Sequence, residues 1–399
     1  MFDKIVAHTK HYEQEIYDLA SELIRTESLS GHEGEAAKIV ADKMKQLKFD
    51  SVEVDEMGNV CGSVGNGPLF VCVDGHMDVV ATGEESLWSR PPLSGEQDAD
   101  NIYGRGATDM KSAIASMIYA GRILKDLNLT DRIRYMVCAS VQEEPCEGLA
   151  WEYMIEERGM HPDFVILAEP SEDQISLAQR GRMELKVSVS GQTAHASAPH
   201  MGDNAIYKMA RIISDLEALN ARMEVKDSEL GKGCLVVSEV HTKAPSRCSV
   251  ADHCDISIDR RLTWGESADY AIDQIKNLPS VVEAGAEVEV HMFEEPSYTG
   301  KQCVKECIFP AWKLDKQHPV THAAQKAYKG LFNKDAVLTT WPFSTNGVAI
   351  MGKNNIPVIG YGPGDLKSCH VPDEYVKKEQ VLAAAMMYVA LPIIYANNN

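Results

Sequence analysis

Three short, continuous apolar runs constrain the fold more than any other feature of the chain. They span Leu69 to Asp74, Ile133 to Ala139 and Phe164 to Ala168, and helical stretches near Ser112 to Leu127 and Glu147 to Glu157 separate them. Apolar runs of this length are typical of strands buried on both faces of a parallel sheet. Because they alternate with helices, the sequence predicts an α/β fold with a mostly parallel sheet flanked by helices.

A different pattern occupies the middle of the chain. From Met183 to Ser190 apolar and polar residues alternate, as they do in a half-buried strand. A helix, two strands, a second helix and a last strand follow, predicted at 204–219, 234–241, 254–262, 267–275 and 287–293. This β-α-β-β-α-β order is that of a small ferredoxin-like module.

The first pattern returns after the module, with a predicted helix near His322 to Lys329 and a strand at Ile356 to Ile359. The module is therefore inserted into a larger domain. We predict that residues 1–180 and 294–399 form the two parts of this parent domain and that residues 181–293 form the inserted domain.

Charge and composition exclude several classes of partner. The chain has 59 acidic and 39 basic residues and a formal net charge of −20, which argues against a nucleic acid or a membrane as the partner. The first residues lack the apolar core of a signal peptide. The apolar run Val381 to Ala396 is shorter than the ~20 residues of a membrane span, and Pro392 interrupts it, so we expect a buried final helix and a short tail. The ten cysteines include no CxxC pair, and reduced thiols in a cytoplasmic protein are expected.

Carboxylates and histidines follow the ends of the apolar runs. His76 and Asp78 follow the first run, Glu143 and Glu144 the second, and Glu169 the third. In open α/β sheets ligands bind at the carboxyl ends of the strands, so we expect these side chains to meet. A charged acid that closes a buried strand is costly without a partner, which favours a bound cation.

Two further groups extend this set. Asp109 follows two glycines at the predicted start of a helix, and His370 follows Cys369 in a late loop. Each position alone has a structural explanation, such as a surface His beside an acid, a helix N-cap or a solvated Glu pair. Together the histidines and carboxylates suffice for two divalent cations that share a bridging acid. Cys146 and Cys369 lie close to the set, and we expect them to fill space.

The order of these motifs resembles that of the M20 metallopeptidase family. The segments Trp88 to Glu96 and Ile102 to Lys111 look like the family signature, and Gly75 to Asp78, the Glu143–Glu144 pair, Glu169 and His370 follow the family order. The family includes succinyl-diaminopimelate desuccinylase, acetylornithine deacetylase and carboxypeptidase G2. The resemblance covers essentially the whole chain and is closest to a YgeY-like subgroup.

The resemblance implies a zinc-exopeptidase-like catalytic domain that binds two Zn²⁺ ions per subunit, with Co²⁺ or Mn²⁺ as possible substitutes. Asp109 matches the acid that bridges the two ions. His76 and Glu169 match the ligands of one ion, and Glu144 and His370 match those of the other. The inserted domain matches the family lid, which is also its dimerisation domain, so a homodimer is expected.

The remaining family roles fall on five positions. Asp78 matches the acid that orients the ligand histidine, and Glu143 matches the general base. His195 lies in a segment that resembles one supplying an oxyanion-stabilising histidine, often to the neighbouring subunit. Arg261 matches the arginine that binds the substrate carboxylate, with Arg260 as the alternative. Asn346 stands where many relatives carry an Asp, and we expect it on the substrate side.

The resemblance thus implies hydrolysis of an amide bond in a small carboxylate-bearing amino-acid derivative, an N-acyl amino acid or a dipeptide, with Glu143 as general acid and base. The alternatives are an N-carbamoyl amino acid amidohydrolase or a dipeptidase of the same fold, and, more distantly, a binding protein that has lost catalysis. Departures at Cys248 and Ala251, where relatives often carry Asn and Pro, concern the substrate and leave the metal residues intact.

Overall fold

The computed structural model describes residues 1–398, and its parent domain contains a nine-stranded sheet. The strand order is β1-β2-β5-β3-β6-β19-β7-β17, and β18 pairs with β7 outside this path. The strands are β1 (Ser51–Val54), β2 (Val60–Val64), β3 (Leu69–His76), β5 (Ile133–Ser140), β6 (Phe164–Leu167), β7 (Ile175–Gln179), β17 (Trp312–Lys313), β18 (Leu338–Trp341) and β19 (Val358–Gly360). The three apolar runs form β3, β5 and β6, which lie side by side near the centre of the sheet.

The centre of the sheet is parallel and its edges are antiparallel. β3 pairs in parallel with β5 and β6, and β19 pairs in parallel with β6. The β1–β2 hairpin and β17 add antiparallel pairs. The hairpin turn is held by Asp55, whose Oδ1 accepts hydrogen bonds from the amides of Met57, Gly58 and Asn59. The predicted α/β class is confirmed, and the sheet is mixed.

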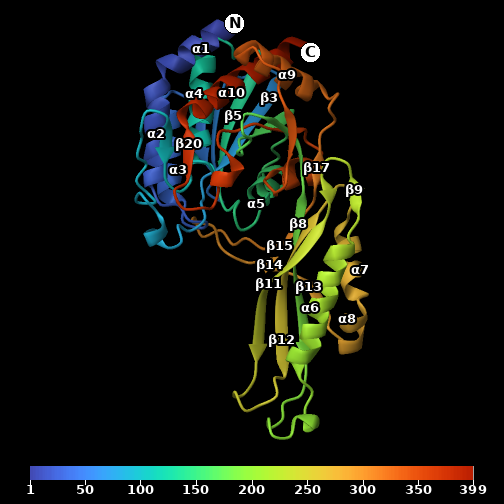
Figure 1. Ribbon diagram of the computed structural model, residues 1–399. Coiled ribbons are helices and arrows are strands. Elements are labelled where there is room, and N and C mark those ends of the chain that lie inside the picture. The colour runs from blue at the N-terminus through green and yellow to red at the C-terminus, as the bar shows by residue number, and fades with distance from the viewer. Residues whose placement is uncertain (399) are drawn as a thin grey trace.

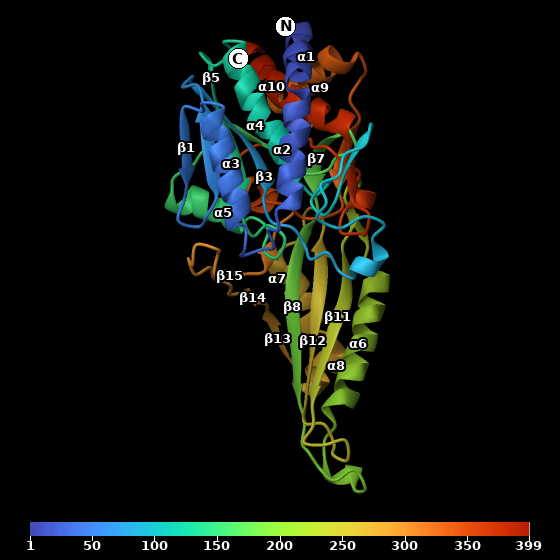
Figure 2. The same ribbon diagram turned by 90° about the vertical axis from the view of Figure 1, so that its left-hand side faces the viewer.

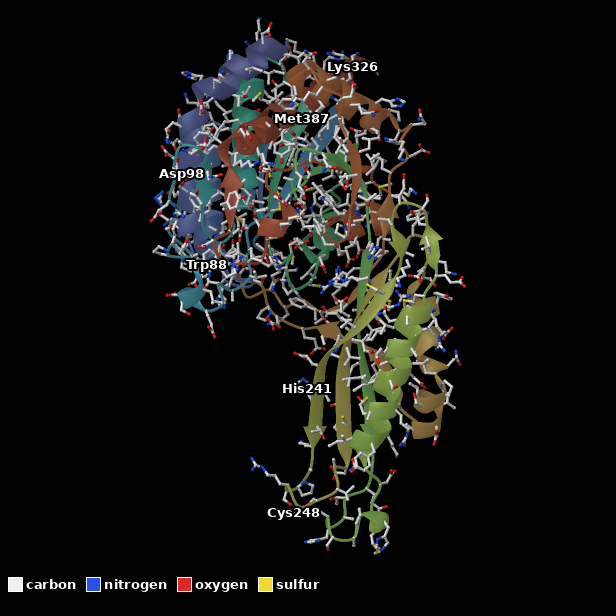
Figure 3. All side chains as sticks on the ribbon, in the orientation of Figure 1. Trp88, Asp98, His241, Cys248, Lys326 and Met387 are labelled. Atoms are coloured by element: carbon white, nitrogen blue, oxygen red, sulfur yellow. The ribbon has the colours of Figure 1, made fainter. Side chains whose placement is uncertain are left out.

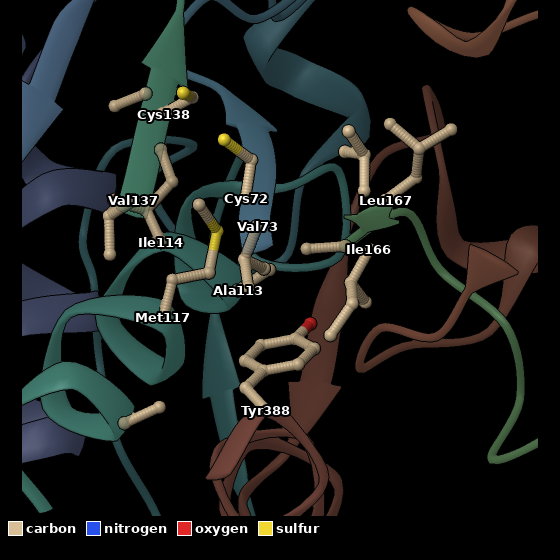
Figure 4. Close-up of a cluster of buried hydrophobic side chains, with 14 of the residues drawn as sticks. Cys72, Val73, Ala113, Ile114, Met117, Val137, Cys138, Ile166, Leu167 and Tyr388 are labelled. Atoms are coloured by element: carbon tan, nitrogen blue, oxygen red, sulfur yellow. The ribbon is translucent and has the colours of Figure 1, made fainter. Parts of the chain in front are cut away.

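Two helices pack directly against the centre of this sheet, and three more pack around those two. α4 (Lys111–Asp126) and α10 (Lys378–Asn398) lie against β3 and β5, and α1 (Phe2–His11), α2 (Glu13–Arg25) and α9 (Pro319–Phe332) pack around them (Figures 1 and 2). Ile114 and Met117 of α4 and Tyr388 of α10 meet Val73 and Val137 of the sheet in a fully buried cluster (Figure 4). This apolar layer packs against β3 and β5 and so fixes the positions of the strand ends.

The expected buried final helix is α10, which continues through Pro392 and past the apolar run to Asn398. Proline costs a helix one hydrogen bond, and the burial of Leu391, Ile393 and Ile394 offsets that cost. By length and composition α10 could cross a membrane, yet 78% of its most apolar window is buried inside the protein.

The inserted domain is a ferredoxin-like layer of strands and helices, as predicted. Its strands lie in the antiparallel order β11-β12-β8-β13, and its helices cover one face (Figure 1). Its elements are β8 (Gly181–Ser190), α6 (Ala205–Arg222), β11 (Cys234–Lys243), β12 (His253–Leu262), α7 (Ala268–Lys276), α8 (Pro279–Ala284) and β13 (Glu287–Val290). It has a hydrophobic core of its own. β16 (Ile308–Phe309), beyond the predicted boundary at residue 293, also pairs with β8.

Short elements complete the described chain. They are the pairs β9 (Val225–Asp227) with β10 (Gly231–Lys232), β14 (Met292–Phe293) with β15 (Lys305–Glu306), and β4 (Asn101–Tyr103) with β20 (Tyr375–Lys377), the helices α3 (Gly34–Gln46) and α5 (Leu149–Glu152), two π-helical segments (Tyr153–Glu157 and Val348–Lys353) and three 3₁₀ turns (Glu85–Leu87, Pro199–Met201 and Leu366–Ser368).

Candidate active site

The ends of three neighbouring strands bring the predicted metal residues together. His76 is the last residue of β3, and it lies opposite Ser140 at the end of β5. Glu143 and Glu144 follow β5, and Glu169 follows β6. Since β3 pairs in parallel with both strands, the three carboxyl ends point to the same edge of the sheet.

Asp109 lies between two histidines. The Nε2 of His76 is 3.0 Å from Asp109 Oδ1, and the Nε2 of His370 is 3.3 Å from Asp109 Oδ2. Glu169 Oε1 lies 3.9 Å from His76 Nε2, and Glu144 Oε2 lies 3.2 Å from His370 Nε2. Each oxygen of Asp109 thus faces one histidine–glutamate pair, which is the arrangement of a bridging acid between two ion positions.

Two groups of three residues each bring their potential ligand atoms within 4.8 Å of one another. The first contains His76, Glu143 and Glu169, and the second contains His76, Asp109 and Glu144. Glu143 Oε2 is 4.0 Å from His76 Nε2, so the predicted base lies beside the ion positions. All the donor atoms are nitrogen or carboxylate oxygen, a set that suits hard to borderline divalent cations.

Burial makes this cluster costly without cations. Glu143 and Glu169 are 6% and 5% exposed, and burial raises the pKa of each well above its ordinary range. Burial also raises the pKa of Glu144. Hydrogen bonds to Asp109 and Glu144 raise the pKa of His370 to about 10. Glu143 Oε1 and Glu144 Oε1 are buried and have no hydrogen-bond partner. These residues therefore fit two divalent ions, which would replace the protons and engage the unpartnered oxygens.

Asp78 acts mainly on the loop that carries the glutamates. Its Oδ1 accepts the amide of Glu143 and its Oδ2 the amide of Glu144, both at 3.1 Å. His76 Nδ1 lies 2.8 Å from the main-chain oxygen of Asp78 and 3.6 Å from its Oδ1. The ring of His76 is thus oriented chiefly by the Asp78 backbone, while the predicted orienting carboxylate holds two amides.

Sequence reasoning missed Glu374, which holds the loop of Asp109. Glu374 is fully buried, and its Oε1 accepts the amides of Thr108 at 2.9 Å and Asp109 at 3.1 Å. Its Oε2 lies 2.6 Å from the Nη1 of buried Arg105. The short distance in sequence from His370 is the only signal that could have suggested this role.

A cleft of about 340 Å³ opens beside the cluster. Arg261 lines it, and its Nε and Nη2 donate to the carboxylate of Asp259 at 2.8 and 2.9 Å. Arg260 lies on the opposite face of β12, 1% exposed, and donates to Glu266 and Gln274. Of the two arginines, Arg261 therefore faces the cleft.

A second arginine of the cleft was not predicted. Arg182 lies opposite Arg261 across the β8–β12 pair. Its Nη2 is 2.6 Å from Glu147 Oε2, and its Nη1 is 2.7 Å from Glu184 Oε1. Arg182 thereby ties the root of the inserted domain, the end of β8 and β12 that adjoins the parent domain, to the loop after β5. Only the strand register reveals this position.

Asn346, expected on the substrate side, lies beneath the cleft and does not line it. Asn346 is 1% exposed, and its Nδ2 donates to Asp74 Oδ2 at 2.9 Å and to Ser140 Oγ at 3.0 Å. Its Oδ1 accepts the amide of Gly148 at 2.8 Å. The polar groups of this side chain are therefore engaged beneath the cleft, where they tie the ends of β3 and β5 to the following loop.

His195 lies at the far end of the inserted domain. It is exposed, and the neighbouring Ala196 donates its amide to the carbonyl of Cys248, which marks the distal tip in Figure 3. Ten residues of β8 separate this end from the root, a length of about 30 Å. Rotation of the domain about its root leaves this distance unchanged. The structure thus does not bring His195 to the cleft of its own chain, and closure of the lid alone does not do so.

Comparison with known proteins identifies the family. Residues 72–393 match the model of peptidase family M20/M25/M40. The chain belongs to the M20 family. It is therefore a hydrolase, in a family whose relatives include desuccinylases, dipeptidases and carboxypeptidases.

Individual M20 relatives cover nearly the whole chain. It is 44% identical over 392 residues to the uncharacterized protein YgeY of Escherichia coli (strain K12), covering 98% of this chain and 97% of that protein. It is 24% identical to a probable succinyl-diaminopimelate desuccinylase of Staphylococcus epidermidis, covering 94% and 96% of the two chains. The fold is similar to that of Bacillus subtilis YXEP, a dinuclear metal-binding M20 peptidase, with a TM-score of 0.72, 14% identity and coverage of 98% and 100%.

Zinc binding to the metal-free M20 site is expected to release protons at pH 7. His370, whose pKa is raised to about 10, and the buried carboxyl groups of raised pKa hold protons that the ions must displace. Because protons leave on binding, zinc affinity should rise as the pH rises. Calorimetric titration in two buffers of different ionisation enthalpy counts these protons.

The variant His370→Ala is the matched control, because it removes one proton-carrying ligand and should release fewer protons. Binding heats that do not depend on the buffer would contradict the charge assignment of the cluster.

Proposed function

We propose that this chain hydrolyses the amide bond of a small carboxylate-bearing amino-acid derivative, an N-acyl amino acid or a dipeptide, with two Zn²⁺ ions per subunit. Co²⁺ or Mn²⁺ would substitute for zinc. The placement of Asp109 between His76 and His370, with Glu143 beside it, carries this proposal. The names of its relatives support the substrate class, because they include a desuccinylase and a dipeptidase.

His76 and Glu169 would hold one ion, Glu144 and His370 the other, and Asp109 would bridge them. When bound, the ions would act as Lewis acids and bring the pKa of the attacking water to about 7. The nitrogen and oxygen donors and the two unpartnered glutamate oxygens support this assignment.

Glu143 would move the proton. Its Oε2 lies 4.0 Å from His76 Nε2 and its Oε1 has no hydrogen-bond partner, so with the ions bound its carboxylate can take a proton from the attacking water and deliver it to the leaving amine. The hydrogen bond from the Glu143 amide to Asp78 Oδ1 fixes the main chain of this residue. The same carboxyl group thus acts as base first and as acid second.

Arg261 would bind the carboxylate of the substrate. It faces the cleft, and Asp259 holds its guanidinium group through two hydrogen bonds. The remaining donor edge can engage a carboxylate in a planar, directed contact that a lysine cannot make. The rivals within this chemistry are an N-carbamoyl amino acid amidohydrolase, which would release ammonia and carbon dioxide, and a dipeptidase, which would release two amino acids.

A catalytically silent binding protein is the more distant alternative. Loss of a metal residue or of the base would favour it. The chain retains His76, Asp109, Glu143, Glu169 and His370 within one cluster, which supports catalysis.

The second subunit would complete the site. His195 lies about 30 Å from the root of its own domain, so we assign it to the cleft of a partner in a homodimer. β11 is an edge strand of the inserted domain, and its Val236 and Val240 are 57% and 56% exposed. Exposed apolar side chains on an edge strand favour pairing with a second copy. A cytoplasmic location agrees with the free cysteines.

Replacing Glu143 with Ala is expected to abolish turnover, by about a thousandfold or more, while the zinc content stays near that of the wild type. The measurement is the rate of product release by the zinc-loaded protein with N-acetyl, N-succinyl and N-carbamoyl amino acids and with dipeptides. A normal rate in this variant would exclude Glu143 as the base, and no product with any of these substrates would contradict the proposed substrate class.

Mixing two inactive variants tests the shared site. His195→Ala and Glu143→Ala homodimers should each be inactive. In a mixed dimer, the His195→Ala subunit keeps its base and receives His195 from its partner. Subunit exchange in an equal mixture should therefore restore about a quarter of wild-type activity, because about half of the dimers are mixed and each holds one complete site. A mixture as inactive as its components would contradict the assignment of His195.

A further inference from the structure

Three consecutive amides of the glutamate loop end on two buried carboxylates. The amide of Gln142 donates to Glu33 Oε1, that of Glu143 to Asp78 Oδ1 and that of Glu144 to Asp78 Oδ2, each at 3.1 Å. Each of these amides therefore has an acceptor oxygen within hydrogen-bond distance. The loop that carries the proposed base and a proposed ligand is held by a row of buried carboxyl oxygens.

Glu33 comes from a part of the chain that the family match does not include. The match begins at residue 72, whereas Glu33 lies in the segment before α3. The same segment reaches the site through Ser28, whose hydroxyl donates to the main-chain oxygen of Met77 at 2.6 Å, and through Ser30, whose hydroxyl donates to Asp78 Oδ2 at 2.7 Å. This segment thus supplies one support of the loop, Glu33, and contacts the other, Asp78.

The contacts of Glu33 differ from those of a helix cap. Ser30 and Glu33 are spaced like a capping box, but Glu33 is itself the N-cap of α3 and its side chain makes no cap hydrogen bond. Its Oε1 accepts the amides of Gly31 at 3.0 Å and of Gln142. The buried carboxyl group of Glu33 therefore does not cap its own helix and instead accepts a hydrogen bond from the glutamate loop.

The loop needs this support at Gln142. Gln142 has φ +53°, a left-handed conformation that is unfavourable for a residue other than glycine. Such a conformation persists when its surroundings hold it. Two hydrogen bonds hold this conformation. The main-chain amide of Gln142 donates to Glu33 Oε1, and Gln142 Nε2 donates to the main-chain oxygen of Pro296 at 3.1 Å. Glu143 follows directly, so its position depends on this turn.

We propose that Glu33 is a positioning residue for the general base, acting through the amide of Gln142. This inference rests on the proposed role of Glu143. Glu33 contributes one acceptor oxygen at a fixed reach, so the length of its side chain and the presence of an acceptor matter, and its negative charge does not.

Two variants separate the effect of the length of the Glu33 side chain from the effect of its charge. Glu33→Gln keeps a carbonyl oxygen at the same reach, and Glu33→Asp keeps the charge but shortens the side chain by one methylene. We expect Glu33→Asp to lower kcat by about tenfold to a hundredfold, with KM within about threefold and the zinc content unchanged, as for other supports of metal sites. We expect Glu33→Gln to keep kcat within about threefold. Rates are expressed per folded, zinc-loaded chain, which removes any loss due to unfolding.

The variant Asp227→Asn is the matched control. Asp227 Oδ1 also accepts two loop amides, those of Glu229 and Leu230, at 2.8 Å each, in the β9–β10 hairpin. This variant should leave kcat unchanged. A normal rate for Glu33→Asp, a larger loss for Glu33→Gln than for Glu33→Asp, or a loss that follows the zinc content would overturn the proposal.

Amide hydrogen exchange distinguishes failure of this proposal from failure of the proposed function. Exchange at residues 142–144 should accelerate at least tenfold in Glu33→Asp and stay near the wild-type rate in Glu33→Gln. This readout needs no substrate. Equal exchange in all three proteins would overturn the role of Glu33 whatever reaction the chain catalyses, whereas the expected exchange pattern with no turnover in the wild type would count only against the proposed function.

Discussion

The burial of several carboxylates in one place is the constraint on which the rest of the structure depends. Asp109, Glu143, Glu144 and Glu169 lie around His76 at the end of the central strands. Taking isolated charges out of water is expensive, and like charges at this range repel one another. The fold can hold such a cluster only if protons or bound cations compensate it, and the nitrogen and oxygen donors present fit divalent cations.

Buried hydrogen bonds beneath the cluster keep these acids from moving apart. Glu374 accepts the amides of the Asp109 loop, Asp78 accepts those of the glutamates, and Asn346 ties the ends of β3 and β5 together. Each of these side chains is buried and polar, and each forms hydrogen bonds with the main chain or with another buried side chain. Contacts of this kind orient ligands in metal sites, and Glu33 adds one more by accepting the amide of Gln142.

Much of this arrangement follows from local sequence patterns. The apolar runs place the central strands, and an acid or histidine at the end of each run indicates where a site forms, because parallel strands end at one edge. The order of the motifs adds the family and its proposed ligands. Arg261 rather than Arg260 faces the cleft because alternate residues of a strand point to opposite faces.

Other features depend on contacts that no local pattern records. Asn346 is polar and stands where the family pattern places the substrate side, but its side chain contacts Asp74 and Ser140 below the cleft. Glu33 and Ser30 have the spacing of a capping box, but their tertiary contacts replace the local ones. Pro392 stays within a helix because the surrounding core offsets its missing hydrogen bond. His195 lies at the tip of its domain, and the contact proposed for it is with a second subunit, which a single chain does not display.

The central claim is that Asp109 bridges two divalent ions that neutralise the buried acids. Native mass spectrometry of the zinc-loaded protein under non-denaturing conditions counts these ions directly. The account predicts two zinc ions per chain in the wild type and at most one in the folded Asp109→Ala variant. A wild-type chain that binds no zinc, or an Asp109→Ala chain that binds two as tightly as the wild type, would contradict it.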